Sequence, residues 1–177
     1  MEKNKSKKIL ILGDIFLDIF ESTEILKMSP ERPVPVLKPL HSTNLLGGAA
    51  NVANNIKSIG GNPFLISKLS NDLTSKKIKQ LLNKNKIKFK IILNKNYSSP
   101  IKKRIVQNDH QFCRVDDETY AKLKKKDEIK IIQFIKKNIN KFESLIISDY
   151  SKGFLTDNLI KSSIKAFKDK KKPIFTD

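Results

Sequence analysis

Arginine, cysteine, glycine and tryptophan are scarce in or absent from this 177-residue chain. It has three arginines among 36 basic residues, one cysteine, six glycines and no tryptophan. The single cysteine, Cys113, excludes an internal disulfide, and the residues around it lack the spacing of a metal site. A chain without disulfides suits a reducing compartment, so we expect a cytoplasmic location.

Long apolar runs are absent as well, although apolar residues make up 38% of the chain. No run approaches the ~18 to 20 residues of a membrane-spanning helix, so we expect no membrane partner. The charged segment 1–8 leads into an apolar run that ends at Asp14, without the cleavage site of a signal peptide. The length suffices for one domain with a sizeable core.

Acidic residues are outnumbered two to one, which gives a formal net charge of +18. A basic face for nucleic acid is one interpretation of that charge. However, the lysines are spread over most of the chain and no aromatic residues interleave with them as a stacking platform. The abundance of Lys, Ile and Asn also fits A/T-rich codon usage. We therefore do not expect nucleic acid as the partner. Binding to duplex nucleic acid with a steep salt dependence would support that interpretation instead.

Apolar patterning predicts alternating strands and helices. Strands are expected at 8–12, 63–67, 88–93, 145–147 and 173–175, and helices at 47–59, 73–85, 127–141 and 155–170. The strands are short unbroken apolar runs, which is typical of strands buried on both faces of a parallel sheet. This order predicts an α/β fold with a doubly wound, mostly parallel sheet.

Two extended excursions interrupt that order, at about residues 15–40 and 98–117. Four prolines exclude a helix from much of the first excursion, and the second has a hairpin turn around Asn108-Asp109. Short hairpins cannot join a parallel sheet by crossovers, so we expect the excursions to pair with each other as a small separate sheet. No linker divides the chain, and residues 1–177 are expected to lie in one domain.

Candidate polar residues follow the buried strands and the first loop. Asp14 and Asp149 each come directly after a buried strand, and such positions share one crevice in open α/β sheets. Turn or helix capping is the alternative for either carboxylate. Gly47-Gly48 and Asn51 open the first helix, where backbone N–H groups and an amide suit sugar hydroxyls. Small-residue packing at a tight junction is the alternative for this segment.

The two arginines of the predicted second hairpin are candidates for anion binding. Arg104 and Arg114 keep the planar guanidinium in a chain that otherwise uses lysine, and this group recognises phosphate in a way that lysine does not. A surface ion pair, such as Arg114 with Asp116, is the alternative. We interpret Cys113, on the same hairpin, as a packing residue rather than a nucleophile.

Four motifs in this order resemble the ribokinase-like (PfkB) carbohydrate kinases. Residues 13–18 resemble the family's opening G-D-x-x-x-D, and residues 47–53 match its G-G-A-A-N-V-A. Residues 29–36 resemble the S-P-E-x-P-V-P-V stretch of the D-glycero-β-D-manno-heptose-7-phosphate kinases, and residues 148–153 resemble their S-D-Y-x-K-G. The chain is thus most similar to the heptose-phosphate kinases, and the resemblance covers almost its whole length.

The resemblance implies a ribokinase-like fold with a small β-sheet lid, formed here by the two excursions. It implies transfer of a phosphoryl group from ATP, with Mg²⁺, to the anomeric hydroxyl of a sugar phosphate, and a homodimer through the lid. The implied substrate-binding residues are Asp14, Gly47, Gly48, Asn51, Lys102, Arg104 and Arg114. Asp149 and Lys152 are implied near the phosphate-transfer region.

The family's catalytic G-A-G-D motif has no counterpart among the six glycines of this sequence. We therefore expect a chain truncated at its C-terminal side, with no catalytic residue of its own and an exposed edge strand near residue 173. Ile19 and Ile101 also depart from the heptose-kinase pattern, which leaves open a ribokinase-like kinase for another sugar. A non-catalytic sugar-binding fragment is a further alternative.

Overall fold

The computed structural model describes residues 8–108 and 110–176. The described residues form a five-stranded sheet, a four-stranded sheet and four α-helices. Asp109, in the predicted turn, lies outside the described residues, as do segment 1–7 and Asp177. No helix in the described part of the chain is both long and apolar enough to cross a membrane.

The first sheet is parallel throughout, as predicted, and its strands pair in the order β5-β4-β1-β8-β9. The five strands are β1 (Lys8–Gly13), β4 (Asn62–Leu69), β5 (Lys88–Leu93), β8 (Phe142–Ser148) and β9 (Ile174–Thr176). β9 lies at the edge of this sheet, and its Phe175 side chain is 58% exposed. The expected exposed edge strand is therefore present.

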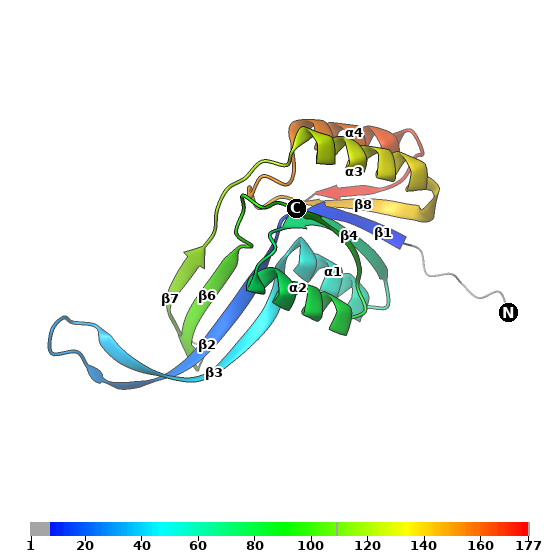
Figure 1. Cartoon of the computed structure of the whole chain (residues 1–177). Coiled ribbons are helices and arrows are strands. Elements are labelled where there is room, and N and C mark those ends of the chain that lie inside the picture. The colour runs from blue at the N-terminus through cyan, green and yellow to red at the C-terminus, as the bar shows by residue number, and fades with distance from the viewer. Residues whose placement is uncertain (1–7, 109, 177) are drawn as a thin grey trace.

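Helices cover both faces of the first sheet (Figure 1). They are α1 (Ala49–Ser58), α2 (Leu73–Lys84), α3 (Lys125–Asn138) and α4 (Asp157–Lys168), with a short 3₁₀ helix (Ile139–Lys141) after α3. α1 and α2 lie on one side of the sheet, and α3 and α4 lie on the other. Asp72 is the N-cap of α2, because its carboxylate accepts a hydrogen bond from the Ser75 N–H at 2.7 Å.

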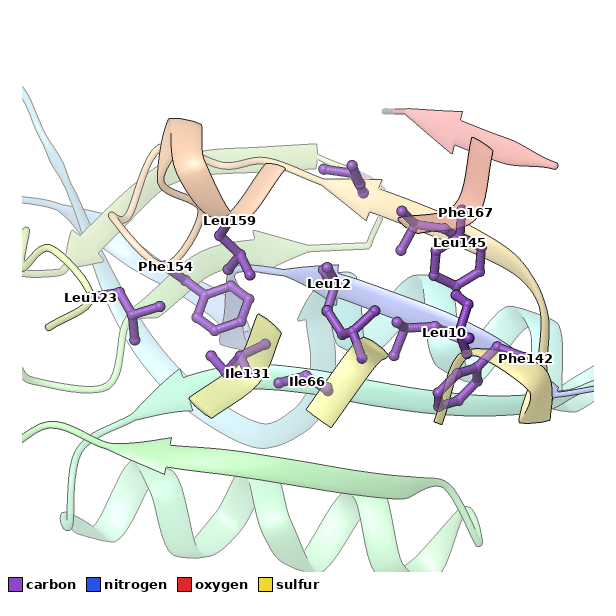
Figure 2. Packing of buried hydrophobic residues seen from close by; sticks show 13 residues of the cluster. Leu10, Leu12, Ile66, Leu123, Ile131, Phe142, Leu145, Phe154, Leu159 and Phe167 are labelled. Atoms are coloured by element: carbon purple, nitrogen blue, oxygen red, sulfur yellow. The ribbon is translucent and has the colours of Figure 1, made fainter. Parts of the chain in front are cut away.

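Two hydrophobic clusters form the core, one on each face of the first sheet. In β1, Leu10 and Leu12 belong to the cluster beneath α3 and α4, whereas Ile11 belongs to the cluster beneath α1 and α2. Figure 2 shows Leu10 and Leu12 among the residues of the first cluster, together with Phe142 and Phe154. Successive strand residues point to opposite faces, so an unbroken apolar run is what a strand with two covered faces requires.

The two excursions form the second sheet, with strands in the order β3-β2-β6-β7. Its strands are β2 (Ile15–Met28), β3 (Pro35–Gly48), β6 (Ile101–Gln107) and β7 (His110–Asp117). Each hairpin is antiparallel, and β2 pairs with β6 in parallel, so the excursions pair with each other as predicted. The long β2–β3 hairpin extends away from the helices and the first sheet (Figure 1).

The first hairpin is longer than the predicted segment 15–40, because β3 continues to Gly48. Pro39 is accommodated on β3 because this strand lies at the edge of the second sheet and needs no hydrogen bond on its outer side. Gly47 and Gly48 therefore end a strand, and the helix predicted from residue 47 begins at Ala49.

Candidate functional site

Asp14 lies at the carboxyl end of β1, where the chain passes from the first sheet to the second. The residue is 1% exposed, and its two carboxylate oxygens accept hydrogen bonds from the N–H groups of Lys152 and Phe154, at 3.0 and 3.2 Å. Burial raises the pKa of Asp14 above its ordinary value, although these bonds and the nearby Lys68 ammonium oppose the rise. Asp14 thus fixes the segment after β8 against the end of β1.

Asp149 follows β8 and lies close enough to Asp14 to contribute to its raised pKa. Its side chain is exposed and its Oδ1 accepts a hydrogen bond from the Ser151 N–H at 2.8 Å, the turn interaction that was the alternative for this residue. Lys152, also expected near the transfer region, pairs through its ammonium with Glu118. The structure therefore brings Asp14, Asp149 and Lys152 together at the carboxyl ends of β1 and β8.

The glycine pair allows a close approach between β3 and β2. A Cβ atom on Gly47 would lie 2.2 Å from the Phe16 ring and 2.8 Å from Oδ2 of Asp18. Gly48 has a φ of +61°, and a Cβ there would lie 2.4 Å from the carbonyl oxygen of Asp14. Only glycine at both positions leaves space for Phe16 and Asp18 beside the start of α1.

A cavity of about 320 Å³ opens between the second sheet and helices α1 and α2. Its polar lining comprises the Asp18 carboxylate and the amides of Asn44, Asn51, Asn54 and Asn85. Carboxylates accept hydrogen bonds and amides both donate and accept them, which matches the hydroxyl groups of a sugar. Asn51, predicted from the sequence, therefore lies in a cavity with the chemistry expected of it.

Asp18 ends the opening motif but is not among the site residues that the sequence predicts. The structure places it in the cavity, next to Gly47 and in an ion pair with Arg104. The available signal was its period-two spacing from Phe16, since alternate residues of a strand share a face. The pairing of β2 with β6 in the second sheet places Asp18 beside the cationic residues of β6.

One face of the second sheet carries alternating positive and negative side chains. Asp18 of β2, Lys102 of β6 and Asp116 of β7 lie in one row across the strands. Phe20 is in the next row, with Arg104 and Arg114. Lys102 pairs with Asp116 at 3.1 Å, and the Arg104 guanidinium lies 5.2 Å from the Phe20 ring centroid.

Arg114 differs from Arg104 in its surroundings. Its Nε donates to Asp116 at 2.8 Å on the exposed edge strand, so it makes the surface ion pair that the sequence suggested as the alternative. Cys113, on the same strand, is exposed, and its interpretation as a packing residue is wrong. No layer of described residues covers β7 as the helices cover the first sheet, which explains why Cys113 does not pack.

Phe16 connects the two groups of site residues. Its ring meets the Tyr150 ring edge-to-face, with centroids 5.3 Å apart, and Nζ of Lys102 lies 5.3 Å from its centroid. Tyr150 lies beside Asp149, whereas Lys102 lies beside Asp18 across the strands. A chain of side-chain contacts through the buried Phe16 ring therefore connects the carboxyl ends of β1 and β8 to the charged face of the second sheet.

The residues at these strand ends do not form a complete metal site. Within 8–108 and 110–176, no group of three or more His, Cys, Asp or Glu side chains could hold a metal ion. Both Asp14 oxygens are bonded to backbone N–H groups, which leaves Asp149 as the solvent-facing carboxylate of the pair. Mg²⁺ prefers six oxygen ligands, and Asp149 alone could supply only part of such a set.

Comparison with known proteins gives a family match and several curated relatives. Residues 6–175 match the model of the pfkB family carbohydrate kinases. The chain is 32% identical over 178 residues to the bifunctional protein HldE of Hyphomonas neptunium, covering 100% of this chain and 37% of that protein. It is 34% identical over 172 residues to the protein of the same name from Helicobacter pylori strain HPAG1. That match covers 97% of this chain and 37% of the relative. The chain thus spans little more than a third of the length of these curated relatives.

Solved structures show the same fold at lower sequence identity. A carbohydrate kinase from Agrobacterium tumefaciens has a TM-score of 0.67 at 15% identity, with 96% of this chain and 53% of that chain covered. Ribokinase from Giardia lamblia has a TM-score of 0.68 at 11% identity, with 96% and 54% covered. The predicted ribokinase-like fold is therefore confirmed, and the chain belongs to the pfkB family of carbohydrate kinases.

Proposed function

We propose that this chain forms the sugar-binding part of an ATP-dependent kinase that phosphorylates the anomeric hydroxyl of D-glycero-β-D-manno-heptose 7-phosphate. This reaction belongs to the synthesis of ADP-heptose for the lipopolysaccharide core. The observation that carries the proposal is a cavity where the Asp18 carboxylate and several amides meet the cationic strand β6. Hydroxyl groups and a phosphate are the ligands that suit these two kinds of surface. The family match and the relatives named HldE support the same assignment.

Each part of the surface has a proposed role. Asn51, Asp18 and the backbone at Gly47 and Gly48 hold the sugar hydroxyls. Lys102, Arg104 and Arg114 face the substrate from the second sheet, which acts as the lid, and the first two neutralise its phosphate. Asp14 holds the segment that carries Lys152, while Asp149 and Lys152 lie on the side of phosphate transfer. When bound, ATP with Mg²⁺ would supply the phosphoryl group, and none of the residues named here is assigned to accept the hydroxyl proton.

The two departures from the heptose-kinase pattern lie away from the charged face. Ile19 and Ile101 pack against the core cluster that includes Leu17 and Leu46, on the other side of the second sheet from Asp18 and Arg104. They are therefore packing residues of the lid rather than substrate contacts. Their departure from the heptose-kinase pattern is therefore no argument for a kinase that acts on another sugar.

A second copy of this chain is the partner we propose for the long hairpin. The distal part of β2 and β3 exposes several large apolar side chains, namely Ile25, Leu26, Met28, Val34 and Leu40. Their position on one projecting hairpin suits the expected homodimer through the lid. Sedimentation equilibrium should give a dimer for the wild type and a monomer for Leu26→Asp. A wild-type monomer at high protein concentration would overturn this assignment.

Isothermal titration calorimetry with heptose 7-phosphate tests the proposed function. Arg104→Gln is expected to weaken binding about 10- to 100-fold, because one charge-assisted contact is worth about 1.5–3 kcal/mol. Asp18→Asn should have a similar effect through the cavity. Lys161→Gln is the control that removes one positive charge elsewhere, since Lys161 is exposed on α4, away from the cavity and from the long hairpin. Equal affinity for heptose without its phosphate, or no binding by the wild type, would contradict the proposal.

A further inference from the structure

All four connections between the two sheets lie at the end of the first sheet where its parallel strands finish. β1 continues into β2 through Asp14, and β3 leads into α1, where the Ala49 N–H donates to the Asp14 carbonyl at 2.9 Å. Segment 94–100 leads into β6, and segment 118–124 leaves β7 for α3. Two features therefore hold the second sheet on the first: these connections, and the packing of Leu17 and Leu46 in the core cluster beneath α1 and α2.

Lys68, near the end of β4, lies at the centre of these connections. Its side chain is 1% exposed, which is unusual in a chain where lysine is the commonest surface residue. The ammonium donates hydrogen bonds to the carbonyl oxygens of Ala121 and Lys152. It also lies 4.2 Å from the ring centroid of Tyr97, which is itself buried. One side chain thus contacts the segment before β6, the segment after β7 and the segment after β8.

The partners of Lys68 are themselves held together. The Gly153 backbone packs so closely on Ala121 that a Cβ there would lie 2.7 Å from the Ala121 oxygen. The Leu123 N–H donates to the Gly153 carbonyl at 2.8 Å, and the Lys152 ammonium pairs with Glu118 of the same segment. The ammonium of Lys68 therefore cross-links segments that already pack against each other.

A buried ammonium is retained here although burial of a charge is costly. The carboxylate of Asp14 offsets part of that cost, since Asp14 and Lys68 interact electrostatically. An apolar side chain at this position would leave the carbonyls of Ala121 and Lys152 without this donor. The three donors of an ammonium let one residue bind two carbonyls and face an aromatic ring.

We infer that Lys68 is a positioning residue whose buried ammonium fixes the inclination of the second sheet on the first. It thereby sets the distance from Lys102 and Arg104, on the second sheet, to Asp14 and Asp149, at the carboxyl ends of β1 and β8. Lys68 touches no substrate in this account and acts only through the connecting segments. Its consequence for substrate binding rests on the proposed function, whereas its effect on the second sheet does not.

Electron–electron distance measurements between two spin labels test this inference. Cys113 is the sole cysteine and is exposed on β7, so it carries one label without further change. Lys161→Cys, at an exposed position of α4, provides the other. The labelled chain is diluted with an excess of unlabelled Cys113→Ser chain, so that distances between two copies do not contribute. We then expect one narrow distance distribution in this labelled background and a broadened or shifted distribution when Lys68→Met is added. Lys68→Gln, which keeps an amide donor, should give an intermediate result and serves if Lys68→Met does not fold.

Lys172→Met is the matched control for Lys68→Met. The Lys172 ammonium also donates to two backbone carbonyls, those of Ile139 and Phe142, but it does so at the end of α3. Its loss should lower stability and leave the distance distribution unchanged. Heptose 7-phosphate should bind at least ~10-fold more weakly to Lys68→Met and with wild-type affinity to Lys172→Met. An unchanged narrow distribution in both Lys68 variants would overturn the inference, while failure of wild-type binding alone would overturn only the proposed function.

Discussion

Gly48→Ala is expected to lower the free energy of unfolding by about 3 kcal/mol, measured by urea denaturation. Gly48 has φ +61° and ψ −139°, a backbone conformation that alanine rarely adopts. The added Cβ would lie 2.4 Å from the Asp14 carbonyl oxygen, which accepts the hydrogen bond from the Ala49 N–H. The substitution therefore combines backbone strain with displacement of the junction between β1, β2 and α1.

Gly60→Ala is the matched control for Gly48→Ala. Gly60 also has a positive φ, of +86°, but a Cβ there would have no heavy atom within 4 Å. Gly60→Ala should lower the free energy of unfolding by about 1 kcal/mol, from the backbone conformation alone. Equal losses of stability in the two variants would show that the contact between Gly48 and Asp14 has no energetic effect.

The free energy of unfolding is expected to rise by about 2 kcal/mol between pH 8 and pH 10 through Lys68 alone. Burial lowers the pKa of Lys68 from 10.5 to about 8, and the charge of Asp14 opposes this shift. Below pH 8 both the folded and the unfolded chain hold the proton, so the cost of the buried charge is fully present. Above pH 8 the folded chain releases the proton while the unfolded chain keeps it, so stability rises with pH.

Comparison of variants separates this effect from the general loss of positive charge. Lys68→Met should lack the Lys68 contribution, whereas Lys172→Met should keep it, because Lys68 is intact there. The rise in stability with pH should end near pH 10. Burial raises the pKa of Tyr97, so above that pH this tyrosine ionises more readily in the unfolded chain, which favours unfolding. A wild-type pH dependence identical to that of Lys68→Met would contradict the lowered pKa.

Much of the fold follows from local patterns in the sequence. The run Lys8–Gly13 has no polar alternation, and only a strand covered on both faces gives that pattern a stable place. The separate second sheet follows from the same logic, because its hairpins lack the helices needed to cross over into the parallel sheet. The exact end of the first hairpin did not follow, since residues 41–48 continue as a strand by pairing with residues 15–22 of β2, and apolar periodicity does not show this pairing.

The site was predicted in part, and the limits have physical causes. Asn51 and Arg104 were selected because an amide near a helix start and a rare guanidinium carry chemical information that one sequence can show. Lys68 was not selected, because its burial depends on segments 26 or more residues away and nothing adjacent distinguishes it from the other lysines. Asp18 was missed because the strand pairing places Arg104 beside it.

Amide hydrogen–deuterium exchange with and without heptose 7-phosphate locates the bound sugar phosphate on the protein. We expect slower exchange in β2 around Asp18, at the start of α1 and in β6 around Arg104, with no change in α3 and α4. Slower exchange confined to the groove between α3 and α4, which is lined by Lys136, Lys165 and Lys170, would contradict this expectation. That result would mean that the sugar phosphate follows general positive charge rather than the surface between the two sheets.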